Sequence, residues 1–277
     1  MLELKSDGDE KAIYLIGFTH VSSGDQVDSQ GVGSILLNGT DGDIRFWYIV
    51  LDQSEFSGPD AEANLENIQW LTPRVLAHQQ AVDAITAIGA TYPARFATLF
   101  SSLNALRKSV RSWSQTLNDY FQKVEGKREF GLKVFVTESS DPRANTPTND
   151  TAATGGRGYL LARRVASEAK KRRSETLSSI VTDISEMLSN LGADISRRSV
   201  VTLADPDDER TLIGNIAVLI DRGNENVIDK VSHAFSGQYD HVLRVDTVIS
   251  GPWAPYSFCP DLQAAAAEST PSVTSHS

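Results

Sequence analysis

The chain has 277 residues, 40% of them hydrophobic and 22% charged, which is typical of a soluble globular protein. Its net charge of −10 would repel a phosphate backbone at long range, so we expect no nucleic-acid partner. A single cysteine, Cys259, excludes an internal disulfide framework and any Cys-rich zinc or iron–sulfur site. The first ten residues lack the layout of a signal peptide, and no apolar stretch approaches a membrane span. We therefore expect a cytoplasmic protein with no membrane partner.

The first half of the chain predicts strands mixed with helices. Residues 12–19 and 44–51 are apolar and rich in β-branched and aromatic residues, as buried strands are. The second strand is apolar on both faces, so it needs cover on both sides. A helix is expected to begin at Thr72-Pro73 and to end at Gly89, and a short strand covers residues 92–100. Ser101 opens the clearest helix, whose apolar residues keep a 3-4 spacing as far as Val124.

The second half predicts the order strand, helix, strand, strand, helix, strand. The expected elements are strand 128–137, helix 158–191, strands 198–204 and 212–221, helix 225–236 and strand 241–249. This is the split βαβ order of a ferredoxin-like sandwich. The fold class is therefore α+β, with an N-terminal α+β domain over residues 1–124 and a modified ferredoxin-like domain over residues 125–261. Residues 262–277 are small and polar and are expected to form a disordered tail.

Few residue patterns in the sequence indicate chemistry. The five histidines do not form a helical zinc pair, and neither a nucleophile elbow nor a P-loop is present. His78 lies on the apolar side of its helix, which favours a satisfied core or interface histidine over a general base. The sequence therefore predicts a protein that is not an enzyme, with no metal and no cofactor. The alternative is a small-ligand-binding protein or enzyme that uses the glycine-rich stretch Gly155 to Gly158 before a helix.

Two stretches are candidate partner-binding surfaces. Arg163 and Arg164 precede Lys170 and Lys171 by one heptad, so the four share one side of a helix in an otherwise acidic chain. They form either a solvated face or a docking stripe for an acidic partner, such as another copy of this chain. The segment SGPWAPYSF supplies Trp253, Tyr256 and Phe258. These aromatic residues either pack onto the last sheet as a C-terminal clasp or anchor a protein interface.

The same C-terminal segment resembles the signature of the gas vesicle protein F/L family (GvpF/GvpL). Other blocks agree in order: Tyr14 to Gly17, His78, Pro93 to Phe96, Thr98 to Phe100, Gly131 to Val134 and Gly158 to Leu161. Ala97 departs from the pattern, since the family commonly has glycine there.

The resemblance implies a non-enzymatic accessory protein of gas vesicle formation. Family members are two-domain α+β proteins that are thought to bind the small hydrophobic shell protein and to help nucleate or assemble the vesicle. The expected partners are therefore the shell protein and other gas vesicle accessory proteins, in the cytoplasm with the gas vesicle.

Overall fold

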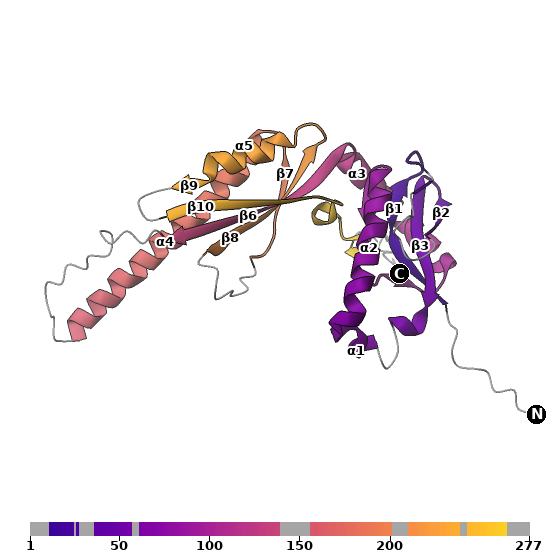
Figure 1. The fold of residues 1–277 in the computed structure, drawn as a ribbon, viewed down its shortest axis with the longest axis horizontal. Coiled ribbons are helices and arrows are strands. Elements are labelled where there is room, and N and C mark those ends of the chain that lie inside the picture. Colours follow the sequence, from indigo (N-terminus) through magenta and orange to yellow (C-terminus); the bar gives the residue numbers. More distant parts are fainter. Residues whose placement is uncertain are drawn as a thin grey trace, which may run out of the picture. The chain divides into compact units, whose positions relative to one another are not determined.

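The computed structural model describes residues 11–24, 26–27, 36–56, 61–138, 156–200, 210–238 and 243–264 (Figure 1). The chain is a mixed α and β protein with two sheets, as the sequence predicts. It divides into two compact units, one formed by Met1–Arg128 with Trp253–Ser277 and the other by Glu129–Pro252. This division differs from the expected domains, because the residues from Trp253 onward join the first unit and not the second.

The first unit is built on a sheet with the strand order β2-β3-β1-β4, in which β5 also pairs with β1. The strands are β1 (Lys11–His20), β2 (Leu37–Asp41), β3 (Ile44–Asp52), β4 (Thr91–Pro93) and β5 (Leu99–Phe100). Strand β1 pairs antiparallel with β3, β4 and β5, and β2 pairs antiparallel with β3. The register of β1 against β3 shifts between Leu15 and Gly17. The two long central strands correspond to the two strongest strand predictions.

Helices cover both faces of this sheet, as the two apolar faces of residues 44–51 require. Helix α2 (Ile68–Ala87) packs Val82 and Ile85 against Trp47. Helix α3 (Leu103–Val124) contacts β1 and β3, and its Trp113 lies edge-on to Phe18 at 6.2 Å. Most of the apolar residues that give this helix its 3-4 spacing are buried, so the predicted helix is confirmed. Shorter elements are the 3-10 turn Gln53–Glu55 and helix α1 (Ala61–Glu66).

Two local predictions in the first unit are wrong. Helix α2 begins at Ile68 and not at Pro73, because the Asn67 side chain caps it by accepting a hydrogen bond from Gln69 N at 3.0 Å. Residues 92–100 are not one strand. The chain turns between β4 and β5, where Ala97 takes a left-handed conformation with φ of 62°.

The second unit has the strand order β7-β8-β6-β10-β9. Its strands are β6 (Lys127–Glu138), β7 (Asp194–Arg197), β8 (Thr211–Asp221), β9 (Gly237–Gln238) and β10 (Leu243–Trp253). Helices α4 (Gly156–Asn190) and α5 (Asn226–Phe235) bury Ile184 and Val231 in one core with Val134 and Val218 of the sheet. The strand predicted at 198–204 lies earlier, as β7, and residues 201–204 are outside the described residues.

The C-terminal segment packs into the first unit. Ala254 is 1% exposed and belongs to the core that contains Tyr14 and Val82. The Tyr120 hydroxyl donates to the Pro255 carbonyl at 3.1 Å, and the Tyr92 hydroxyl donates to the Pro260 carbonyl at 3.2 Å. The expectation that this clasp packs onto the last sheet is therefore wrong. Leu262, which was assigned to the tail, is buried, and residues 265–277 lie outside the described part of the chain.

Candidate functional site

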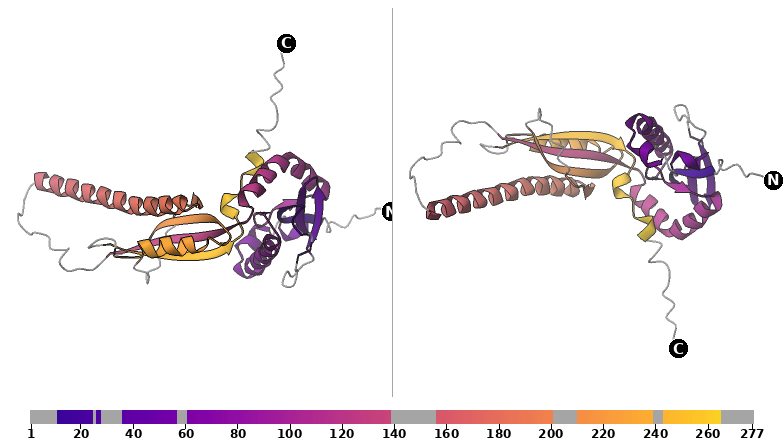
Figure 2. Two further views of the ribbon diagram at one scale, coloured as in Figure 1. Left: turned by 90° about the horizontal axis from the view of Figure 1, so that it is seen from above. Right: turned by 90° about the horizontal axis from the view of Figure 1, so that it is seen from below.

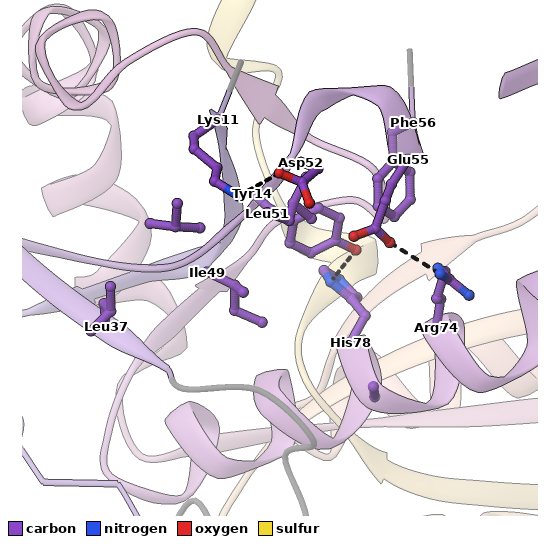
Figure 3. Close-up of a pocket in the computed structure, with 12 residues that line it drawn as sticks. Lys11, Tyr14, Leu37, Ile49, Leu51, Asp52, Glu55, Phe56, Arg74 and His78 are labelled. Carbon is purple, nitrogen blue, oxygen red and sulfur yellow. Dashed lines mark hydrogen bonds and ion pairs between the residues drawn. The ribbon is translucent and has the colours of Figure 1, made fainter. Parts of the chain in front are cut away.

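The first unit contains a pocket of about 580 Å³ at the end of β3 (Figure 3). Its lining comes from β1, β2, β3, the turn that follows β3, and α2. The residues are Lys11, Tyr14, Leu37, Ile49, Val50, Leu51, Asp52, Glu55, Phe56, Arg74, Ala77 and His78. The volume lies in the range of sites that take a small molecule or a few side chains of a partner.

Apolar side chains make up much of the pocket wall. Ile49, Leu51 and Phe56 pack against the core below, while Leu37 is 37% exposed and Val50 is 43% exposed. Both of these residues line the pocket and keep apolar surface in solvent. Burying that surface against a partner would be favourable by about 25 cal/mol per Å².

Two ion pairs border this apolar wall. Lys11 pairs with Asp52, and Arg74 pairs with Glu55 at 3.0 Å. The Arg74 guanidinium also lies 4.0 Å from the ring centroid of Trp70. Because each cation faces a carboxylate, the rim is polar and locally balanced in charge, which favours an apolar occupant over a strongly charged one.

A hydrogen-bonded relay lies at the base of the pocket. Nδ1 of the buried His78 lies 2.9 Å from the Tyr14 hydroxyl, and Nε2 lies 3.1 Å from the Ala94 carbonyl. The carbonyl can only accept, so the proton sits on Nε2 and Nδ1 accepts from Tyr14. The Tyr14 oxygen in turn accepts from Ala97 N at 3.3 Å. His78 is thus a satisfied buried histidine, as the sequence favours.

Burial sets the protonation of this relay. Removal from water lowers the pKa of His78, because it disfavours the charged imidazolium. Burial also raises the pKa of Tyr14 to about 12. The pair is therefore neutral near pH 7, and it holds β1, α2 and the turn after β4 together without a charge beneath the pocket.

The outward side of α1 and α2 adds further exposed apolar residues. Ile68 is 75% exposed and Leu76 is 58% exposed, and Leu65 and Val75 are exposed to a smaller degree. On α2 these positions neighbour Arg74 and Ala77 of the pocket in the sequence. The first unit therefore leaves apolar surface uncovered both inside the pocket and on the helix that borders it.

The aromatic residues expected to bind a partner all lie in the first unit. Trp253, at the end of β10, is 46% exposed. Tyr256 is partly buried against the core that contains Tyr14, and burial raises its pKa. Lys123 lies 5.6 Å from the ring centroid of Phe258. The segment thus combines a packed part with one tryptophan that keeps about half its surface in solvent.

The basic residues expected to bind a partner lie on α4 in the second unit. Arg163, Arg164, Lys170 and Lys171 are all exposed. Of the glycine stretch in the alternative hypothesis, Gly156 to Gly158 form the start of α4, and Gly155 is outside the described residues.

Sequence reasoning missed the pocket. Its clearest signal was the run Ile49-Val50-Leu51, where three consecutive residues of a strand are apolar. The pattern indicated that other elements pack on both faces of this strand. In the structure that packing does not reach the end of β3, and Val50 is left exposed. The charged rim gave no signal, because its residues lie far apart in the sequence.

Within the ranges that the structure describes, no group of three or more His, Cys, Asp or Glu side chains is arranged to hold a metal ion. None of the described helices combines the length and the apolar content that a membrane span requires.

Comparison with known proteins gives one family. The family model described as "Gas vesicle synthesis protein GvpL/GvpF" matches residues 12–260. A gas vesicle protein L of a Streptomyces strain is 23% identical over 74% of this chain and 75% of its own length. A gas vesicle protein L of Haloferax mediterranei is also 23% identical, over 73% of this chain and 65% of its own length.

Solved structures resemble the fold. The crystal structure of GvpF from Anabaena matches with a TM-score of 0.62 at 16% identity, covering 91% of this chain and 99% of that one. GvpF from Microcystis aeruginosa matches with a TM-score of 0.61 at 15% identity, over 90% and 99% of the two chains. At these identities the likeness concerns the fold alone.

Proposed function

Because the chain belongs to the gas vesicle GvpL/GvpF family, we propose that it is an assembly accessory protein that binds the small hydrophobic shell protein. Family membership itself gives a role in gas vesicle formation. We further propose that binding helps to nucleate or build the vesicle, that other gas vesicle accessory proteins are partners, and that the protein acts in the cytoplasm with the gas vesicle. In this role the chain is not an enzyme and needs no cofactor.

The observation that carries the proposal is the pocket of the first unit with its exposed apolar wall. The site has a volume of about 580 Å³, and two of its lining residues, Leu37 and Val50, keep 37% and 43% of their surface in solvent. Concave apolar surface of this kind marks interaction sites, because a monomer gains nothing by exposing it.

The chemistry of the pocket suits a hydrophobic protein segment. A shell subunit with exposed apolar surface aggregates unless a partner covers that surface. An apolar side chain that enters the pocket would contact apolar lining residues such as Ile49, Leu51 and Phe56, while the ion pairs at the rim stay in water. We propose that this combination of an apolar pocket with a hydrated, charged rim lets the protein bind a shell subunit reversibly.

Trp253 is proposed as a second contact in the same first unit. Its indole is 46% exposed, and tryptophan is enriched among the residues that dominate binding energy. Tyr256 and Phe258 would support it, since Tyr256 packs against the core of the unit and Phe258 lies under Lys123.

We also propose that the second unit is a modified ferredoxin-like sandwich that folds as a domain of its own. Its elements follow the order strand, helix, strand, strand, helix, strand, apart from the short β9. When β9 is left out and the remaining four strands are numbered within the unit, their order is 2-3-1-4, which supports this assignment.

The proposal is tested by co-purification from a cell that makes the full gas vesicle gene set. A tagged wild-type chain should capture the shell protein, and a Leu37→Asp/Val50→Asp double variant should capture little. Val248→Asp, which changes a 42% exposed valine of β10, is the matched control and should capture as much as the wild type. Equal capture by all three chains would reject the pocket as the binding site, and no capture by the wild type would reject shell binding.

A further inference from the structure

The N-terminal half of α4 extends beyond the edge of the sheet on which the C-terminal half of the helix packs (Figure 2). All residues from 163 to 175 are exposed, whereas Ile180, Ile184 and Leu188 are fully buried. The first side chain that packs against the core is Leu177. About half of this 35-residue helix is therefore held by the sheet, and no side chain among the described residues of the unit's core packs against the rest.

The stripe of α4 that faces the core changes from apolar to basic where the helix leaves the sheet. Arg163, Lys170, Leu177 and Ile184 are spaced by seven residues, so they lie along one line of the helix. Leu177 and Ile184 pack into the core, and Arg163 and Lys170 continue the same line into solvent. An element that covers the free half as the sheet covers the other half would thus meet cations.

Only part of this charge is neutralised within the helix. Arg164 pairs with Glu168 at 3.2 Å and Lys171 pairs with Glu175 at 3.8 Å. In the described part of the chain, Arg163, Lys170 and Arg172 have no carboxylate within the 4.0 Å limit of an ion pair. We call Arg163, Arg164, Lys170 and Lys171 the basic face.

The opposite charge is concentrated at the other end of the same chain. Residues 1–66 contain 13 of the 36 acidic residues and only three of the 26 basic ones. Residues 157–173 contain seven basic residues and one acidic residue. Within the first unit, Glu62 and Glu66 are exposed and lie one turn apart on α1.

We propose that the basic face of α4 docks onto the acidic first unit of a second copy of this chain. If two copies exchange this contact reciprocally, it closes a twofold dimer; if each copy makes it with a different neighbour, it builds a ring or an open chain of copies. Complementary charge steers such an encounter and fixes its register. Nucleic acid is disfavoured as the occupant, because the chain as a whole carries −10 and would be repelled. The inference does not depend on binding of the shell protein.

The salt dependence of self-association provides the first test. Sedimentation of the full purified chain should show concentration-dependent association at low salt, where charges act over about 30 Å, and its loss at physiological salt, where they act over about 8 Å. A chain that stays monomeric at all concentrations in low salt would overturn the proposal. Association that is insensitive to salt would also overturn it.

Charge reversal identifies the two surfaces. Arg163→Glu/Lys170→Glu and Glu62→Lys/Glu66→Lys should each weaken self-association at least about tenfold. Lys108→Glu/Lys230→Glu reverses two exposed lysines of α3 and α5 and is the control for net charge; it should leave association unchanged. Circular dichroism at the same concentrations shows whether each variant is folded.

The decisive sample is a mixture of the two reversed variants. The α4 made acidic in one variant can then pair with the α1 made basic in the other. The unchanged basic α4 of the second variant can likewise pair with the unchanged acidic α1 of the first. Association should return in the mixture, although neither variant associates alone. If the mixture stays monomeric, or if the control variant loses association equally, the proposed pairing of α4 with α1 is wrong.

Discussion

The Tyr14 hydroxyl lies 2.9 Å from Nδ1 of His78, and this hydrogen bond joins β1 to α2 beneath the candidate pocket. Both groups are buried and each has a further partner, Ala97 N for the hydroxyl and the Ala94 carbonyl for Nε2. The relay therefore connects the two sides of the pocket base to the turn between β4 and β5.

Tyr14→Phe should lower the free energy of unfolding by about 1–3 kcal/mol, because it leaves two buried polar groups, His78 Nδ1 and Ala97 N, without their partner. Chemical denaturation measures the change. Tyr48→Phe in the same sheet is the control and should cost less. Equal effects of the two substitutions would mean that the relay contributes nothing specific.

Stability should fall as the pH drops below neutral. Burial lowers the pKa of His78 in the folded state below the ordinary value of 6.5. Just below that pH the unfolded chain therefore binds a proton at His78 that the folded chain does not bind. The contribution is complete above pH 6.5 and is lost as the pH falls from 6.5 toward the folded-state pKa. Denaturation between pH 7 and pH 5 tests this. His78→Gln should flatten the profile, and an unchanged profile would show that His78 is not the group responsible.

Ala97→Gly should stabilise the protein. Ala97 has φ of 62°, a conformation that costs an L-residue about 1–2 kcal/mol and costs glycine little. The greater freedom of glycine in the unfolded chain offsets part of the gain, so the expected net increase is up to about 1 kcal/mol. Ala105→Gly, within α3, should instead destabilise by about 1 kcal/mol. A loss of stability in Ala97→Gly would contradict the strain argument.

The sequence predicted the elements whose signals are local. The 3-4 apolar spacing from Leu106 to Val124 corresponds to the buried side of α3, and the apolar run from Ile44 corresponds to β3 between two helices. The start of α2 was misplaced, because Pro73 was read as a first-turn residue although Asn67 provides the cap. The break at Ala97 could not be predicted, since it is fixed by tertiary contacts such as Ala94 N to the Ile16 carbonyl.

The site was harder to predict, because it depends on which segments meet. The aromatic segment was expected to pack onto the last sheet or to anchor an interface, whereas its Tyr256 packs against the core of Tyr14 and Val82, more than 170 residues away in the sequence. Lys11, Asp52, Glu55 and Arg74 come from four separate elements, and no spacing rule brings them to one rim.

Trp253→Ala should cost about 1–2 kcal/mol, less than the about 3–5 kcal/mol of a fully buried tryptophan, because 46% of its surface is exposed. Leu262→Ala, at a 7% exposed position of the same segment, should cost more, about 2–5 kcal/mol. Thermal unfolding and shell-protein binding should be measured on the same samples. If Trp253→Ala unfolds the first unit while binding per folded molecule is unchanged, Trp253 is a packing residue and not a contact.

Equilibrium binding of purified shell protein to Val50→Asp and Val248→Asp tests the central claim most directly. The two valines are 43% and 42% exposed and both lie on strands, so the substitutions differ in location and in little else. Burying a carboxylate against an apolar partner should weaken binding by about 2 kcal/mol or more, about thirtyfold, for Val50→Asp. Val248→Asp should bind like the wild type. Wild-type affinity in Val50→Asp, or an equal loss in both variants, would contradict the assignment of the pocket as the shell-protein site.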